Sequence, residues 1–107
     1  MSTLSTHILD ISTGKPAEGV TVHLQQDGKT LATGVTNAQG RLAAFVPSLP
    51  AGRYRLVAEI GAWFGDTGRK TIYLCAHIEF VTGERADEHF HLPFVIAPGG
   101  WSTYRGS

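Results

Sequence analysis

The segment Val20-Thr21-Val22-His23-Leu24-Gln25 decides the fold class. Apolar and polar side chains alternate through it, and successive side chains of a β-strand point to opposite faces of a sheet. The segment is therefore predicted to be a strand with one buried face and one wet face. The same alternation returns over residues 54–60 and 89–96, and another strand is expected over residues 72–80.

Turn signals separate these strands at short intervals, because glycine, proline and asparagine favour tight reversals of the chain. They lie at residues 14–16, 27–28, 37–40, 50–52, 82–83 and 98–100. One short helix is expected near residues 61–67. About seven or eight strands at this spacing predict an all-β fold, a two-sheet antiparallel β-sandwich. With 107 residues, the whole of 1–107 is expected to form a single domain.

The composition narrows the classes of function. Nine basic and nine acidic residues cancel, and no run of like charge offers a surface for nucleic acid. Cys75 is the only cysteine, so no intramolecular disulfide and no thiolate zinc framework is expected. The sequence shows no secretory signal and no apolar run long enough to span a membrane. A cytoplasmic protein with a small-molecule substrate and no membrane partner is predicted.

The candidate chemical groups are five histidines, six arginines and scattered hydroxyls. His89 and His91 are two residues apart in a predicted strand, so their side chains share a face. Such a pair can in principle coordinate a zinc ion. No third ligand stands at a fixed spacing from them. Cys75 lies in a predicted strand interior and is interpreted as structural. In isolation, His7 is a polar-face residue of the first strand.

Two blocks at the ends of the chain, residues 4–10 and 102–107, resemble the signature sequences of the 5-hydroxyisourate hydrolases of the transthyretin-like family. Four inner segments resemble the family pattern in the same order. They are residues 13–17, 36–41, 50–54 and 88–93. The resemblance covers nearly the whole chain. It implies a transthyretin-like sandwich and a homotetramer, a dimer of dimers, with the active sites at the subunit interface.

The transthyretin carriers share this fold, so the site residues must separate an enzyme from a carrier. The resemblance implies that carriers lack the histidines, the arginine and the Tyr-Arg-Gly-Ser ending, whereas this chain has His7, Arg41, His91 and residues 104–107. It thus implies hydrolysis of 5-hydroxyisourate to 2-oxo-4-hydroxy-4-carboxy-5-ureidoimidazoline in urate degradation, with no metal or other cofactor. A carrier and a noncatalytic sandwich module remain the alternatives.

Hydrolysis of a cyclic amide needs an activated water, a stabilised oxyanion and a proton for the departing nitrogen. His7 or His91 is expected to take the proton from water, because imidazole titrates near neutral pH; which of the two does so stays open. Arg41 is a permanent cation whose planar fork suits carbonyl oxygens. Tyr104 and Ser107 are expected to hydrogen-bond substrate or water, and the terminal carboxylate of Ser107 is available to orient an imidazole. His7, Arg41 and Tyr104 are expected to bind substrate as well.

The sequence departs from the family pattern at three places. Leu74-Cys75 replaces an expected Pro-Glu, Gly99 stands where an aromatic residue is common, and Trp101 stands for a tyrosine. The first departure lies in a predicted strand. The other two lie beside the expected site, where they affect the shape of the pocket.

Overall fold

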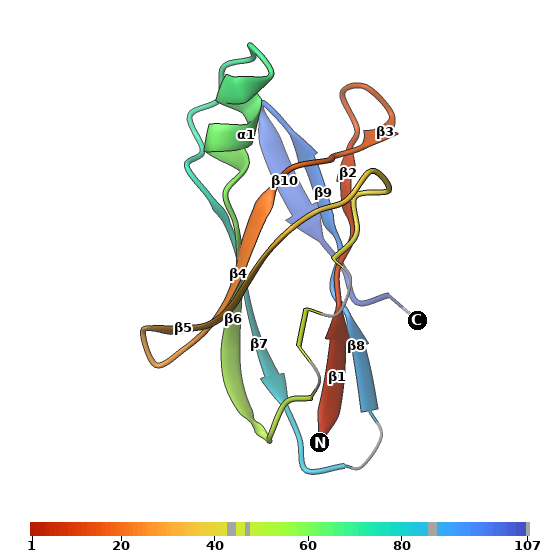
Figure 1. The fold of residues 1–107 in the computed structure, drawn as a ribbon, viewed down its shortest axis with the longest axis vertical. Coiled ribbons are helices and arrows are strands. Elements are labelled where there is room, and N and C mark those ends of the chain that lie inside the picture. The colour runs from red at the N-terminus through yellow and green to blue at the C-terminus, as the bar shows by residue number, and fades with distance from the viewer. Residues whose placement is uncertain (43–44, 47, 86–87, 107) are drawn as a thin grey trace.

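The computed structural model describes residues 1–42, 45–46, 48–85 and 88–106, which form two packed β-layers (Figure 1). The first layer is an antiparallel sheet in the order β5 (Lys29–Val35), β4 (Thr21–Gln26), β6 (Gly52–Ala58) and β7 (Ala76–Thr82). The second layer contains the sheet β10 (Gly100–Thr103), β9 (Phe94–Ala97), β2 (Ile8–Asp10) and β3 (Lys15–Pro16), and the two-stranded sheet of β1 (Ser2–Ser5) and β8 (Glu88–His91). The all-β sandwich prediction is confirmed.

The core lies between the two layers and follows the predicted alternation. Val22 and Leu24 of β4 are fully buried, and Leu56 of β6 joins them. Ile8 and Phe94 close the core from the opposite layer. Burial of each such side chain contributes roughly 1.5–3 kcal/mol to the free energy of folding. Burial of this interdigitated core is therefore the main contribution that stabilises the packing of the two layers.

Two strand pairings are parallel, which the antiparallel prediction did not include. β1 pairs with β8 and β2 pairs with β9 in the parallel sense. Alternation has a period of two in both kinds of sheet, so it does not distinguish them. The interruption between the two pairs lies at Thr6 and Leu92, where the Thr6 hydroxyl donates a 2.7 Å hydrogen bond to the Leu92 carbonyl. Pro93 follows Leu92 and cannot donate a main-chain hydrogen bond. The alternating residues 89–96 therefore form two strands, β8 and β9, instead of one.

The helix expected near residues 61–67 is present as α1 (Ile60–Asp66). Its Ile60 and Phe64 are buried, and the indole N–H of Trp63 donates a 2.7 Å hydrogen bond to the Glu18 carbonyl. Over the described ranges, no helix is long and apolar enough to cross a membrane.

The strand expected over residues 72–80 begins only at Ala76, so that prediction was wrong for residues 72–75, and Cys75 lies just before β7 instead of in a strand interior. Ile72 and Leu74 are 86% and 83% exposed. The Leu74 carbonyl accepts a 3.0 Å hydrogen bond from Gly61 N–H, which ties this segment to the first turn of α1 instead of to a sheet. A Cβ at position 61 would lie 2.6 Å from the Tyr73 carbonyl oxygen, so the close approach requires glycine there.

Candidate active site

The outward face of the β1–β8 pair carries a row of hydroxyl and imidazole groups. Leu4 is buried toward the core, so its strand neighbours Thr3 and Ser5 point outward. On β8 the outward residues are His89 and His91. The parallel register sets Thr3 opposite His89 and Ser5 opposite His91, so hydroxyls and imidazoles become direct neighbours.

His7 and Arg41 come together although they are far apart in the sequence. Alternation continues through Thr6, which is 2% exposed, so His7 follows Ser5 on the outward face. An antiparallel β-bridge joins His7 to Arg41. Next to it, Ile8 N–H donates a 2.8 Å hydrogen bond to the Gly40 carbonyl. Two of the residues expected in the active site are thus held by one main-chain contact.

The turn before Arg41 fixes this contact. Asn37 Oδ1 accepts hydrogen bonds of 3.0 Å from the main-chain N–H groups of Gln39 and Arg41. Gly40 has a φ of +75°, and a Cβ there would lie 2.5 Å from the Ile8 carbonyl oxygen. Only glycine fits this left-handed position so close to the backbone of β2. The Arg41 side chain itself is exposed and can reach a substrate.

His91 is covered by the C-terminal segment. Gly106 N–H donates a 2.8 Å hydrogen bond to the His91 carbonyl, and a Cβ at position 106 would lie 2.5 Å from Cδ2 of the imidazole. Tyr104 is 59% exposed, and within the described residues it makes no hydrogen bond to His7, Arg41 or His91. Ser107 lies outside the described residues. The structure therefore brings together three of the five expected site residues.

The surroundings keep His91 neutral. Burial lowers the pKa of His91, and the positive charge of Arg41 lowers it further. A neutral imidazole at neutral pH carries a lone pair that can accept a proton. Within the described residues, the hydrogen bonds of the ring involve only Nδ1, so Nε2 is available to a water molecule or a substrate.

Ser5, which no sequence pattern singled out, contacts both histidines of β8. Its Oγ lies 2.7 Å from Nδ1 of His91 and 2.9 Å from Nε2 of His89. On the far side of His89, Nδ1 lies 2.5 Å from Thr3 Oγ1. Ser5 and His7 are two residues apart and so share a face, but this spacing does not specify the neighbours of either one. Their neighbours became visible once the register between β1 and β8 was known.

This network also bears on the zinc alternative for His89 and His91. A serine hydroxyl bridges the two rings, in the place where a shared ion would have to lie. Within the described ranges, no group of three or more His, Cys, Asp or Glu residues is arranged to hold a metal ion.

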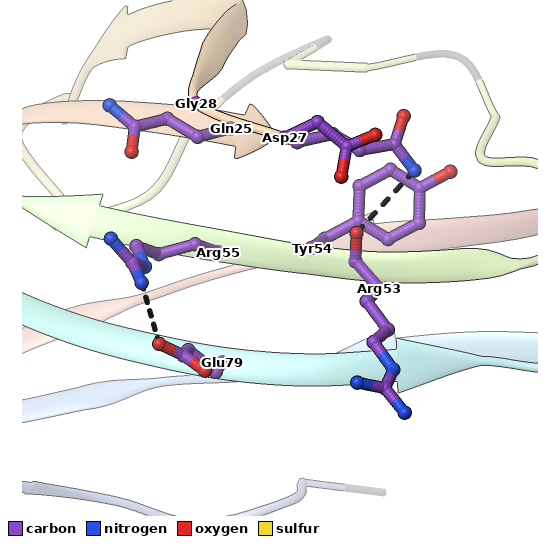
Figure 2. Close-up of a pocket in the computed structure, with 8 residues that line it drawn as sticks. Gln25, Asp27, Gly28, Arg53, Tyr54, Arg55 and Glu79 are labelled. Carbon is purple, nitrogen blue, oxygen red and sulfur yellow. Dashed lines mark hydrogen bonds and ion pairs between the residues drawn. The ribbon is translucent and has the colours of Figure 1, made fainter.

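Two hollows lie elsewhere on the molecule. One of about 220 Å³ lies on the face of the β4, β6 and β7 sheet, where Arg55 and Glu79 form an ion pair at 2.7 Å (Figure 2). The other, of about 840 Å³, lies beside α1 and residues 69–73. Neither includes His7, Arg41 or His91. The candidate active site is therefore a partly exposed surface of the single chain.

This chain belongs to the HIUase/Transthyretin family, whose family model matches residues 4–106. Among its relatives, the 5-hydroxyisourate hydrolase of Salmonella dublin is 42% identical over 110 residues, which cover 97% of this chain and 80% of the relative. The structure of Klebsiella pneumoniae 5-hydroxyisourate hydrolase superposes with a TM-score of 0.92 at 67% identity, covering 100% of this chain and 94% of that chain. Sea bream transthyretin, solved in complex with thyroxine, superposes with a TM-score of 0.89 at 27% identity, covering 96% and 93%. The resemblance seen in the sequence is confirmed.

Proposed function

We propose that this chain is a 5-hydroxyisourate hydrolase of urate degradation, which converts its substrate to 2-oxo-4-hydroxy-4-carboxy-5-ureidoimidazoline. The observation that carries the proposal is the convergence of His7, Arg41 and His91 on one outward face. The names of similar proteins, at 42% and 67% identity, support the same activity. A carrier needs a shaped ligand cavity but no paired base and cation, so this site favours the enzyme.

His91 is assigned as the general base. Its Nε2 faces no hydrogen-bond partner among the described residues, and the lowered pKa keeps it unprotonated at neutral pH. A water molecule between Nε2 and the substrate carbonyl would lose its proton to His91 as it attacks the carbonyl carbon. General-base catalysis of this kind typically contributes about 10²- to 10⁴-fold in rate.

Arg41 is assigned to the carbonyl oxygen of the scissile amide. Its planar guanidinium is cationic and can donate hydrogen bonds from more than one N–H group to oxygen acceptors. Negative charge develops on that oxygen in the tetrahedral intermediate, so Arg41 stabilises the transition state more than the ground state. His7, joined to Arg41 through the main chain, is assigned to binding the ring of the substrate.

The remaining parts of the proposal concern the assembly. Tyr104 and Ser107 are assigned to hydrogen-bonding substrate or water, and residues 1–107 to one domain of a cytoplasmic homotetramer. The exposure of Arg41 and Tyr104 supports a site that a neighbouring subunit completes. Enclosure would exclude water and strengthen the electrostatic contribution of Arg41.

Substitution of Arg41 tests the proposed site. Arg41→Ala should lower kcat/KM for 5-hydroxyisourate about 100-fold or more without lowering Tm, because its side chain is exposed and serves the oxyanion. Arg53→Ala is the matched control, an exposed arginine on the other layer. Equal turnover by the two folded variants would remove Arg41 from the mechanism, whereas saturable binding without turnover by the wild-type protein would favour a carrier.

A further inference from the structure

A continuous run of hydrogen bonds leads away from His91, on the side of the ring opposite to Nε2. From Nδ1 of His91 it passes 2.7 Å to Ser5 Oγ and 2.9 Å on to Nε2 of His89. Nδ1 of His89 continues it 2.5 Å to Thr3 Oγ1. Every link joins an imidazole nitrogen to a hydroxyl, and each of these groups can both donate and accept a hydrogen bond.

The surroundings of His89, at one end of these hydrogen bonds, favour a positive charge more than the surroundings of His91 do. His91 is partly buried and lies near the cationic Arg41 and near His7, so a second cation there is disfavoured. His89 is exposed, and solvent can stabilise a charge on its ring. Both groups are imidazoles, so the difference between them comes from their surroundings alone.

We propose that Ser5 and His89 form a proton relay that moves the positive charge of His91 to His89 while the tetrahedral intermediate exists. This inference rests on the proposed hydrolase function. Ser5 acts as the bridge, His89 as the temporary acceptor and Thr3 as the group that orients His89.

The relay conserves every proton. In the resting state His91 carries its proton on Nδ1 and donates it to Ser5, Ser5 donates to Nε2 of His89, and Nδ1 of His89 donates to Thr3. When water attacks the substrate, its O–H bond breaks and the proton binds Nε2 of His91. The Nδ1 proton of His91 passes to Ser5 Oγ as the Ser5 proton passes to Nε2 of His89, which leaves His91 neutral and His89 cationic.

Collapse of the intermediate reverses these transfers. The carbon–nitrogen bond breaks, and its electron pair takes the proton from Nε2 of His91. Ser5 returns a proton to Nδ1 of His91, and His89 returns one to Ser5. Thus the same imidazole is first the base and then the acid, and the relay returns to its resting state without any additional reactant.

Three variants separate a relay from simple positioning. Ser5→Ala interrupts the run and should lower kcat about 10- to 100-fold, with KM changed less than about twofold. Ser5→Thr keeps the hydroxyl in a strand and should retain most of the activity. His89→Gln keeps a hydrogen-bonding side chain beside Ser5 but cannot carry the proton, so it should lower kcat about tenfold.

His23→Gln is the matched control. His23 also has both ring nitrogens hydrogen-bonded, to Thr33 at 2.9 Å and to Glu59 at 2.8 Å, but it lies on the other layer. Its kcat should equal that of the wild type. Wild-type kcat in His89→Gln would overturn the relay, and if Ser5→Ala alone were slow, Ser5 would be a positioning residue only.

A spectroscopic measurement tests the resting state independently of turnover. ¹⁵N NMR of the wild-type protein above the His91 pKa should show the neutral ring protonated on Nδ1, and this preference should be lost in Ser5→Ala. A neutral His91 protonated on Nε2 in the wild type would contradict the proposed direction of the relay. If the wild-type protein did not accelerate decay of 5-hydroxyisourate, the proposed function would fail, whereas an active wild type with a normal His89→Gln variant would refute the relay alone.

Discussion

Gly106 donates a main-chain hydrogen bond of 2.8 Å to the carbonyl oxygen of His91. The chain has already passed through β10 on the neighbouring sheet, and this bond brings it back to β8 (Figure 1). Ser5 contacts the ring from β1. The imidazole assigned as the base is therefore confined by two segments from opposite ends of the sequence.

Gly106→Ala tests this confinement. A Cβ at position 106 would lie 2.5 Å from Cδ2 of His91, so either the ring or the C-terminal segment must shift. A displacement of about 1 Å at a catalytic group can cost on the order of 100-fold in rate, and we expect kcat/KM to fall at least tenfold. Gly83→Ala, where an added Cβ meets nothing within 4 Å, should keep wild-type kinetics. Equal kinetics for the two variants would show that the covering of His91 is irrelevant to catalysis.

Asn37→Ala should weaken the support of Arg41. The change removes the Oδ1 that accepts hydrogen bonds from the main-chain N–H groups of Gln39 and Arg41. The free energy of unfolding should fall by about 1 kcal/mol, and kcat/KM should fall with it because Arg41 loses its fixed position. Steady-state kinetics and urea unfolding measure the two effects. Asn37→Asp retains the acceptor and should restore most of the activity; if Ala and Asp variants behaved alike, the hydrogen bonds would not position Arg41.

The pH dependence follows from the lowered pKa of His91. Burial and then the charge of Arg41 hold this pKa below its ordinary value of 6.5. A base must be unprotonated, so the acid limb of kcat/KM should be centred below pH 6.5. Arg41→Gln removes a positive charge and should raise the pKa of His91, measured by NMR titration, while Arg53→Gln should not. An acid limb of kcat/KM centred at or above pH 6.5 would be inconsistent with His91 as the base.

Arg69→Met should destabilise the fold through the buried Asp10. Asp10 is 1% exposed and forms an ion pair with Arg69 at 2.7 Å. Burial alone would raise the pKa of Asp10, but the hydrogen bonds of Ser12 and Arg69 and the charge of Arg69 outweigh burial, and the pKa is lowered below 3.8. Loss of one partner of a buried pair typically costs about 3–5 kcal/mol, and we expect about 3 kcal/mol at neutral pH.

The sign of the pH effect is fixed by the direction of that shift. A lowered carboxyl pKa adds stability above pH 3.8 that is lost as the pH falls through the folded-state value. The difference in the free energy of unfolding between the wild type and Arg69→Met, measured by urea unfolding, should therefore become smaller below pH 3.8. Arg55→Met breaks an exposed pair with Glu79 and should cost less than about 1 kcal/mol. A cost for Arg69→Met as small as that of the control would refute the stabilising role of the buried pair.

The sequence predicted those parts of the fold that depend on local alternation. β4 and β6 lie where apolar and polar residues alternate, and α1 lies within a residue of its expected start. Residues 72–74 have strand-forming side chains, but their backbone packs against α1, where Gly61 N–H donates a hydrogen bond to the Leu74 carbonyl. The contact depends on tertiary packing, which local propensity does not include.

The resemblance to the family named candidate residues for the site, whereas the contacts among its side chains come from the structure. His7, Arg41 and His91 were expected from the resemblance to the family; in the structure a β-bridge joins His7 to Arg41, and burial of His91 is accompanied by a lowered pKa to which Arg41 contributes. The contacts of Ser5 depend on the parallel register of β1 and β8, and a period of two specifies neither direction nor partner. The spacing of the histidine pair at 89 and 91 left a metal ion as an alternative, and in the structure a hydroxyl lies between the two rings.

The most direct test of the account is the ultraviolet decay of freshly generated 5-hydroxyisourate, followed with and without the purified protein and in the presence and absence of a metal chelator. The proposed mechanism predicts that the wild-type protein accelerates the decay far beyond the spontaneous rate, that chelation leaves the acceleration unchanged, and that Arg41→Ala lowers kcat/KM about 100-fold or more. Decay at the spontaneous rate with folded wild-type protein would contradict the assignment of this site as a hydrolase.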